Sequence, residues 1–291
     1  MAQIAFDRTS KRKAAARVFS RGRRRFGLAL PALIFLFAFF ILPLSLLLLR
    51  SIAEPEPGLH NYAKLLGDAT YGRVLLNTFT VAGVVTLVTL FLGYPVAWLL
   101  VILPSRVSRW LFAIVLLSMW TNLLARTYGW MVLLQRTGVI NRTLMNLGVI
   151  DAPLPLINNL LGVTIGMTYI MLPFVILPLH ATLSAIDPAI MQAASIVGAR
   201  PSQIFFRVLL PLSAPGIAAG GLMVFVMALG YYVTPALLGG TANMMLAELI
   251  AQLVQSFLNW GLGSAAAFIL LSLTLVLYGV YVRAFGLGKP Q

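Results

Sequence analysis

Few residues in this chain could carry out chemistry, and those few lie far apart. The 291 residues include seven Asp and Glu, two His and no Cys. His60 and His180 have no carboxylate cluster beside them in the sequence, so we expect no metal site and no cofactor. No phosphate-binding loop of the form Gly-x4-Gly-Lys-Ser/Thr occurs, so any ATP must bind to another chain. The sequence therefore predicts a protein that is not an enzyme.

Three side chains in one apolar stretch are candidates for the path of a solute. Trp120 and Asn122 lie within the stretch, where a buried amide is costly unless it has a partner or a water-filled path. We therefore expect Asn122 to line a cavity. Arg126 follows the start of the stretch by roughly 24 Å of helix, so its guanidinium can extend into interfacial water. We expect the crossing helix to end near Arg126, with residues 128–134 lying along the membrane surface.

Three further candidates lie closer to the C-terminus, and each has two interpretations. Tyr231 and Tyr232 can offer ring faces to a cation, or they can pack between helices in the ordinary way. Glu248 is the only acidic residue in its apolar stretch. It can face a cationic solute, or it can lie in water on a helix at the outer interface. The sequence leaves both choices open.

The elements that must position these residues are membrane-spanning helices. The chain is 60% hydrophobic and 10% charged, whereas soluble domains carry roughly a quarter charged residues. Apolar runs of about 20 residues cross a bilayer as helices, because lipid offers no hydrogen-bond partner to the backbone. The sequence predicts an all-α, polytopic fold with six spans, at about 27–49, 77–103, 109–133, 160–184, 214–236 and 262–282.

The distribution of charge predicts how these spans are oriented. Nine of the 21 Lys and Arg lie in the first 25 residues, and Arg106, Arg109 and Arg283 fall on the same side of a six-span chain. Because positive residues stay inside, both termini are expected in the cytoplasm. We read residues 1–26 as a basic tail at the lipid surface that binds no nucleic acid, 27–284 as the transmembrane domain, and 285–291 as a cytoplasmic end.

The cytoplasmic loop at about 186–212 has an unusual pattern for a loop between spans. Asp187 can cap a helix that begins at Pro188. Gly198 can end that helix and Pro201 can begin a second one. Two short helices that meet at a glycine form a compact knob, which suits docking into a groove on a partner protein.

This loop resembles the coupling loop of permease subunits from binding-protein-dependent ABC importers. The family pattern is Glu-Ala-Ala, three residues, Gly, about nine residues, then a hydrophobic-x-Leu-Pro. Gln192 stands where the family most often has glutamate, which removes a possible salt bridge to the ATPase. The resemblance implies that the residues coupling to the ATPase are Asp187, Gln192, Ala193, Ala194, Gly198, Ala199, Phe205, Leu210 and Pro211.

Other motifs extend the resemblance over nearly the whole chain after the tail, and they are most similar to the spermidine/putrescine branch. They include Asn77-Thr78, Gly93-Tyr94-Pro95, residues 126–130 and Asn259-Trp260-Gly261. The resemblance implies import through the inner membrane, with an ABC ATPase dimer, a second and different permease, and a periplasmic binding protein as partners. It implies a polyamine as solute, with opines or amino-acid-like amines as alternatives. A secondary transporter and a membrane scaffold are the competing classes.

Overall fold

The computed structural model describes residues 30–285, and every regular element in that range is helical. The predicted basic tail and the residues beyond 285 lie outside the described part. The first helix is described from Leu30 to Ala53 and contains a π turn, η1. The elements in chain order are η1 (Phe37–Ile41), α2 (Leu42–Ala53), α3 (His60–Gly67), α4 (Ala69–Ile102), α5 (Ser105–Trp120), α6 (Leu123–Leu134), α7 (Val139–Asn146), α8 (Leu160–Ser184), α9 (Pro188–Ile196), α10 (Pro201–Ile204), η2 (Phe205–Leu209), α11 (Leu210–Leu212), α12 (Ala214–Leu229), α13 (Val233–Leu238), η3 (Thr241–Asn243), α14 (Leu246–Gln255) and α15 (Trp260–Phe285).

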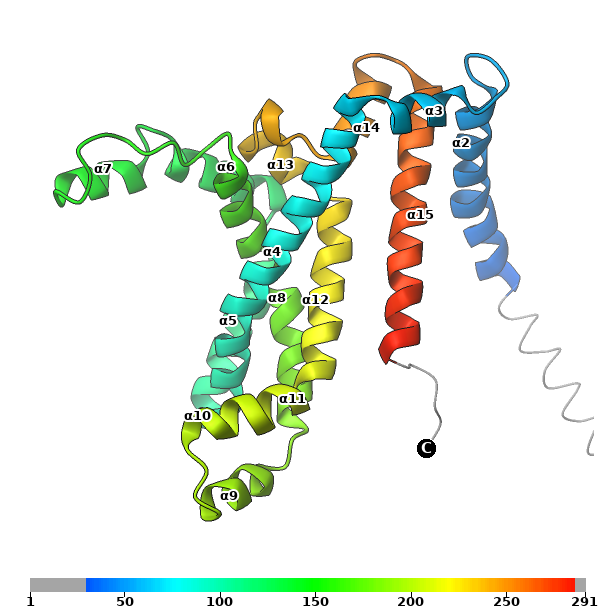
Figure 1. Ribbon diagram of the computed structural model, residues 1–291. Helices are drawn as coiled ribbons and strands as arrows, with labels where there is room; N and C mark the ends of the chain where they lie inside the picture. The colour runs from blue at the N-terminus through cyan, green and yellow to red at the C-terminus, as the bar shows by residue number, and fades with distance from the viewer. Residues whose placement is uncertain (1–29, 286–291) are drawn as a thin grey trace, which may run out of the picture.

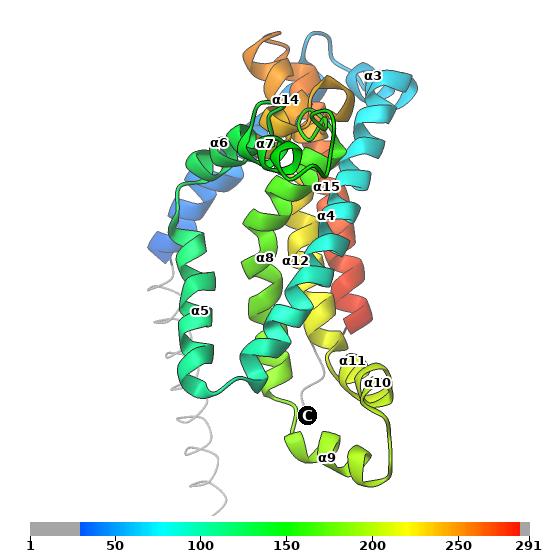
Figure 2. The same ribbon diagram turned by 90° about the vertical axis from the view of Figure 1, so that its left-hand side faces the viewer.

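Three helices, α4, α8 and α12, pack together at the centre of the molecule (Figure 1, Figure 2). Two glycines on α12 allow this close approach. A Cβ added at Gly216 would lie 2.6 Å from Oγ1 of Thr182, and one at Gly220 would lie 3.2 Å from Cα of Val175. Any larger residue would push α12 away from α8, and the buried contacts that dispersion forces stabilise would be lost. The three helices therefore form one tightly packed block.

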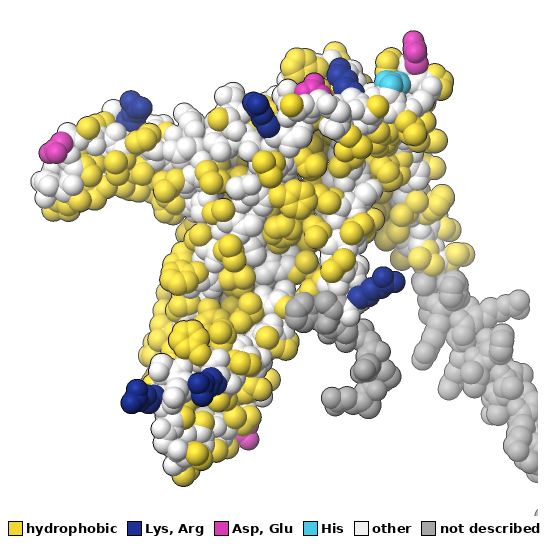
Figure 3. Space-filling model, in the orientation of Figure 1, with side chains coloured by type: hydrophobic (Ala, Val, Ile, Leu, Met, Phe, Trp, Pro, Cys, Tyr) yellow, Lys and Arg dark blue, Asp and Glu magenta, His cyan; other side chains and the backbone are white. Residues whose placement is uncertain are grey.

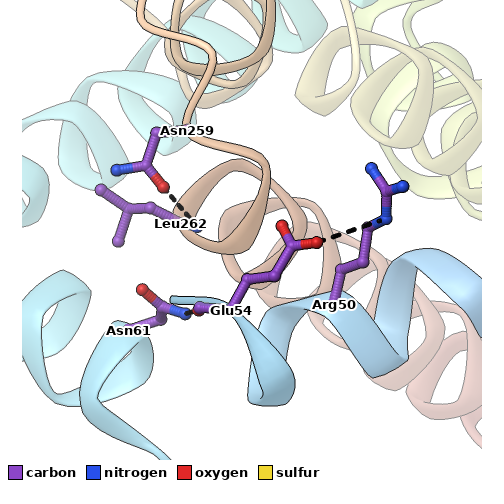
Figure 4. A network of polar contacts seen from close by, with 5 residues as sticks. All are labelled: Arg50, Glu54, Asn61, Asn259 and Leu262. Carbon is purple, nitrogen blue, oxygen red and sulfur yellow. Dashed lines mark hydrogen bonds and ion pairs between the residues drawn. The ribbon is translucent and has the colours of Figure 1, made fainter. Parts of the chain in front are cut away.

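The first helix and the last helix form a second packed group beside this block. α2 lies against α15, and α14 also packs on α15 (Figure 1). Figure 4 shows local polar contacts at one end of this group: the Asn61 amide donates to the backbone oxygen of Glu54 at 2.7 Å, and the Arg50 side chain lies 3.6 Å from the Glu54 carboxylate. Asn259 accepts from the backbone N–H of Leu262 at 3.1 Å, at the start of α15. These contacts fix the turn that follows the first helix.

The two ends of the molecule differ in what they carry. We name them the α14 end, which also holds α3, α6, α7 and α13, and the α9 end, which also holds α10 (Figure 1). α2 runs toward the α14 end and α15 runs back toward the α9 end. On the face shown in Figure 3, hydrophobic side chains cover the flanks, whereas charged side chains gather toward the helix ends. This distribution is typical of a protein whose middle lies in hydrocarbon.

Four helices in the described part are long and apolar enough to cross a membrane, and there are up to six crossings if each of two bent pairs counts as one span. The four are Leu30–Ala53, Ala69–Ile102, Leu160–Ser184 and Trp260–Arg283. The second of them begins at Ala69, earlier than the predicted residue 77, because Asp68 caps it by accepting from the N–H of Thr70 at 2.7 Å.

The first bent pair corrects our prediction for the third span. We expected the third span, at about 109–133, to end near Arg126, with residues 128–134 lying along the membrane surface. α5 ends earlier, at Trp120, and the chain turns by 97° into the pair α6 and α7, which contains residues 128–134 (Figure 2). The cause is Asn122, whose side-chain oxygen accepts from the N–H groups of Leu124 and Ala125 at 2.9 and 3.2 Å. An amide that caps the next helix starts a new element instead of continuing the old one.

The fifth span also differs from its predicted range of 214–236. α12 ends at Leu229, and α13 begins at Val233 after a short turn that contains Gly230. Pro235 lies in the first turn of α13, where its missing N–H leaves no hydrogen bond unmade. The second bent pair lies before this span, where the segment Pro201–Leu212 meets α12 at 63°.

Candidate functional site

The loop at the α9 end forms two short helices separated by a glycine turn. Asp187 accepts from the N–H of Ala189 at 2.9 Å, and α9 begins at Pro188. Gly198 has φ of +85°, a left-handed conformation that glycine adopts without a steric penalty. The N–H of Arg200 then donates to the side-chain oxygen of Gln203 at 2.9 Å, at the start of α10. Local chemistry therefore determines the shape of this knob.

The surface of the knob is apolar and exposed. Ile196 and Val197 are 84% and 88% exposed, beside the turn at Gly198. Gln192 and Ala193 are also exposed, whereas Ala194 and Ala199 are half-buried. Aliphatic side chains this exposed next to a helix end gain free energy if a partner covers them.

The second half of the loop is tied to the central block through aromatic rings. Phe205 packs edge-on against Tyr94 of α4, with ring centroids 5.7 Å apart, and also lies beside Trp98 at 6.1 Å. The hydroxyl of Tyr94 forms a hydrogen bond of 3.1 Å with that of Ser213, just before α12. Leu210 packs against the same core cluster, and Pro211 is exposed. The second half of the loop is therefore in contact with α4, and α4 in turn is bonded to the residue that precedes α12.

The candidates for a solute path lie toward the α14 end, and they are not all in one place. Trp120 is 87% exposed at the tip of α5, and Asn122 is exposed and occupied as a helix cap. Arg126 lies within electrostatic range of Tyr231, and its Nε is buried without a hydrogen-bond partner in the described part of the chain. Tyr232 is 40% exposed. Arg126 and Tyr231 are thus the pair that the fold brings together.

Glu248 lies on α14, one of the shorter helices, but it is not in water. Its side chain is buried, with the residue 8% exposed, and Oε2 has no hydrogen-bond partner among the described residues. Burial raises the pKa of this carboxyl, and a contact with the N–H of Met245 partly opposes the rise. The hydroxyl of Thr78 on α4 accepts from the N–H of Leu246 at 2.8 Å, so α14 is held against the central block.

Two residues that connect the knob to the core were not singled out from the sequence. Tyr94 belongs to the Gly93-Tyr94-Pro95 motif, but nothing in its neighbours in sequence indicates a bond to Ser213, 119 positions away.

Among the described residues, no group of three or more His, Cys, Asp or Glu lies close enough to hold a metal ion. The candidate functional features of the described residues are the knob and the polar groups at the α14 end.

A block of membrane-spanning helices with an exposed apolar knob at one end defines a polytopic membrane protein, and comparison gives the family. Residues 76–284 match the sequence model of the binding-protein-dependent transport system inner membrane component. This chain belongs to that family. It is a multi-pass inner-membrane permease component.

Relatives agree with this assignment. The chain is 37% identical over 226 residues, 78% of its length, to the spermidine/putrescine transport system permease protein PotB of Escherichia coli, of which it covers 82%. It is 34% identical over 245 residues to the inner membrane ABC transporter permease protein YdcU of the same species, covering 80% of this chain and 77% of that one. A chain of a bacterial alginate ABC transporter, crystallised with an alginate-bound periplasmic protein, matches with a TM-score of 0.77 at 19% identity, over 94% of this chain and 99% of that one. The similarity to the alginate transporter chain supports the fold alone.

Proposed function

We propose that this permease imports polyamines and that the knob at α9 and α10 receives the force of a separate ABC ATPase. The observation that carries the coupling role is the physical link from the exposed apolar surface of α9 through Phe205 and Tyr94 to the central block. ATP-driven closure of two ATPase subunits would move the knob, and a rigid block would transmit the movement to the pore. Gln192 would contribute an amide at this interface in place of the carboxylate that is usual in the family.

The proposed complex contains an ATPase dimer, a second and different permease, and a periplasmic binding protein. The α9 end would face the cytoplasm and the α14 end the periplasm, with both termini inside. The positive-inside distribution of the sequence supports this orientation. The alginate transporter, crystallised with its periplasmic protein, supports the kind of assembly.

The proposal of a polyamine rests on PotB as a relative and on one chemical feature of this chain. Glu248 offers a buried carboxylate oxygen that has no hydrogen-bond partner within residues 30–285, and an ammonium group would pair with it at low cost. Tyr231, Tyr232 and Trp120 would contribute ring faces near the same end. Arg126 and Asn122 would then position this region, Arg126 beside Tyr231 and Asn122 as the cap of α6.

Uptake of labelled putrescine and spermidine by cells that lack their own polyamine importers tests the substrate. We expect ATP-dependent uptake that disappears when the partner ATPase gene is deleted. Uptake that survives the deletion would indicate a secondary transporter, and preferential uptake of an opine or an amino acid would refute the polyamine assignment while leaving the permease class intact.

Glu248→Gln tests the role of the carboxylate. Glutamine can still accept from the N–H of Met245 and preserve the start of α14, so we expect normal protein levels with a several-fold weaker apparent affinity for the polyamine. The matched control is Glu56→Gln, an exposed acidic residue at the same end of the molecule. Equal affinity in the wild type and the Glu248 variant would refute the contact.

A further inference from the structure

A hollow at the base of α5 has the chemistry of a lipid headgroup site. Its volume is about 460 Å³, and it is lined by Arg106, Arg109, Trp110 and Ala113. All four residues lie on the first three turns of one helix, at the α9 end of the molecule (Figure 2). A hollow of this size lies within the range of ordinary ligand sites, roughly 300 to 1,000 Å³.

The charge around this hollow is not compensated by the chain itself. Arg106 and Arg109 have no ion pair among the described residues, and no acidic residue lies in the first turn of α5. Two cations at the start of a helix oppose the helix dipole, so the local potential is strongly positive. The Nε of Arg109 donates to the backbone oxygen of Ser105 at 3.1 Å, which orients the guanidinium and leaves its two terminal nitrogens available.

The surface above the hollow is apolar, and this distinguishes a lipid from a soluble anion. Trp110 is 75% exposed, and Ile114 and Leu117 continue the exposed stripe up the same face of α5 at 61% and 65%. The helical spacing of three to four residues places these side chains one above another. An acyl chain lying along this stripe would bury them, while its phosphate would meet the two arginines.

We infer that this face of α5 binds one anionic phospholipid, with the phosphate between Arg106 and Arg109 and an acyl chain along Trp110, Ile114 and Leu117. A bidentate guanidinium contact would hold the phosphate, and the net charge of the headgroup would supply the discrimination, because the two arginines carry two positive charges. A zwitterionic lipid of the same chain length would meet the same apolar stripe, but its amine would be repelled by the arginines. The inference does not depend on the identity of the transported solute.

The test uses the import complex purified in mild detergent, incubated with equal amounts of phosphatidylglycerol and phosphatidylethanolamine that carry identical acyl chains. Bound lipids are counted by native mass spectrometry. We expect the wild type to retain phosphatidylglycerol preferentially, and Arg106→Gln and Arg109→Gln each to lower that preference about tenfold, the size of one charge-assisted hydrogen bond.

Two further variants make the result specific. Arg283→Gln removes an exposed charge in the last turn of α15 and should leave the preference unchanged within about twofold. Ala113→Phe fills the hollow and keeps both arginines, so it should lower retention of phosphatidylglycerol although the charge is unaltered. Equal retention by wild type, Arg106→Gln and Ala113→Phe would overturn the inference. Displacement of the lipid by millimolar inorganic phosphate would also overturn it, because it would show a site for a free anion.

Discussion

Replacing Gly198 with valine should uncouple the ATPase from the pore through backbone strain alone. Gly198 has φ of +85°, and a Cβ added there would meet nothing within 4 Å, so no clash contributes. An L-residue in the left-handed region costs about 1–2 kcal/mol, and a β-branched residue lies at the upper end of that range. At 1.4 kcal/mol per factor of ten, about 2 kcal/mol lowers the population of the correct turn roughly 30-fold. The other interactions that stabilise the turn are weak, because they are three backbone hydrogen bonds of 3.0 to 3.3 Å exposed to solvent.

The assay measures uptake of labelled polyamine and the amount of ATPase that co-purifies with the tagged chain, both normalised to membrane level. Gly198→Asn is the matched control, because asparagine tolerates positive φ and should retain most activity. Gly148→Val is the positional control: this glycine has φ of +68° and open space around it, but lies near α7 at the other end. The reasoning is refuted if Gly198→Val transports normally, or if Gly198→Asn fails as badly as valine, since the side chain and not the backbone would then be at fault.

Three other substitutions probe the links described above. Tyr94→Phe keeps the ring packing but removes the hydrogen bond to Ser213. We expect the free energy of unfolding, measured by thermal unfolding, to fall by about 1 kcal/mol. Uptake should fall less than with Tyr94→Ala. Asn141→Leu removes an amide that forms hydrogen bonds with three backbone groups near α7. Each backbone group left unpaired costs about 1–3 kcal/mol of folding free energy. Limited proteolysis should then cut the variant within residues 135–155. Burial raises the pKa of Glu248 above its ordinary value of 4.5, so its ionisation destabilises the folded state only as pH rises above that value. Glu248→Gln should therefore raise Tm at pH 8 and have little effect at pH 4; an equal change at both pH values would contradict this linkage.

The knob could be predicted in detail because its shape depends on neighbours in sequence. An aspartate cap, a proline at the first helical position and a glycine at positive φ each act within a few residues, and each lies where the sequence places it. Composition likewise predicted the helical membrane fold, because hydrocarbon leaves the backbone few choices.

A break in the third span was predicted near Arg126, but its position at Trp120, and the break in the fifth span, could not be predicted from hydropathy. Asn122 reads equally well as a buried polar group or as a helix cap, and only the position of α6 separates the two. Prolines were equally ambiguous: Pro95, Pro173 and Pro178 lie inside continuous helices, whereas Pro235 opens a new one. The burial of Glu248 depends on how α14 packs on α15, which is a long-range contact that no local pattern encodes.

The early end of α5 has a consequence for the surrounding bilayer. Its 16 residues give a helix of roughly 24 Å, about 6 Å less than the hydrocarbon thickness, whereas the 26 residues of α15 give roughly 39 Å. Trp120, at the tip of α5, marks the depth to which the headgroups must descend on that side. From these lengths we expect an uneven annulus of lipid, thinner beside α5 and of full thickness beside α15. Lipids with longer acyl chains should therefore increase the free-energy cost of hydrophobic mismatch beside α5 more than beside α15.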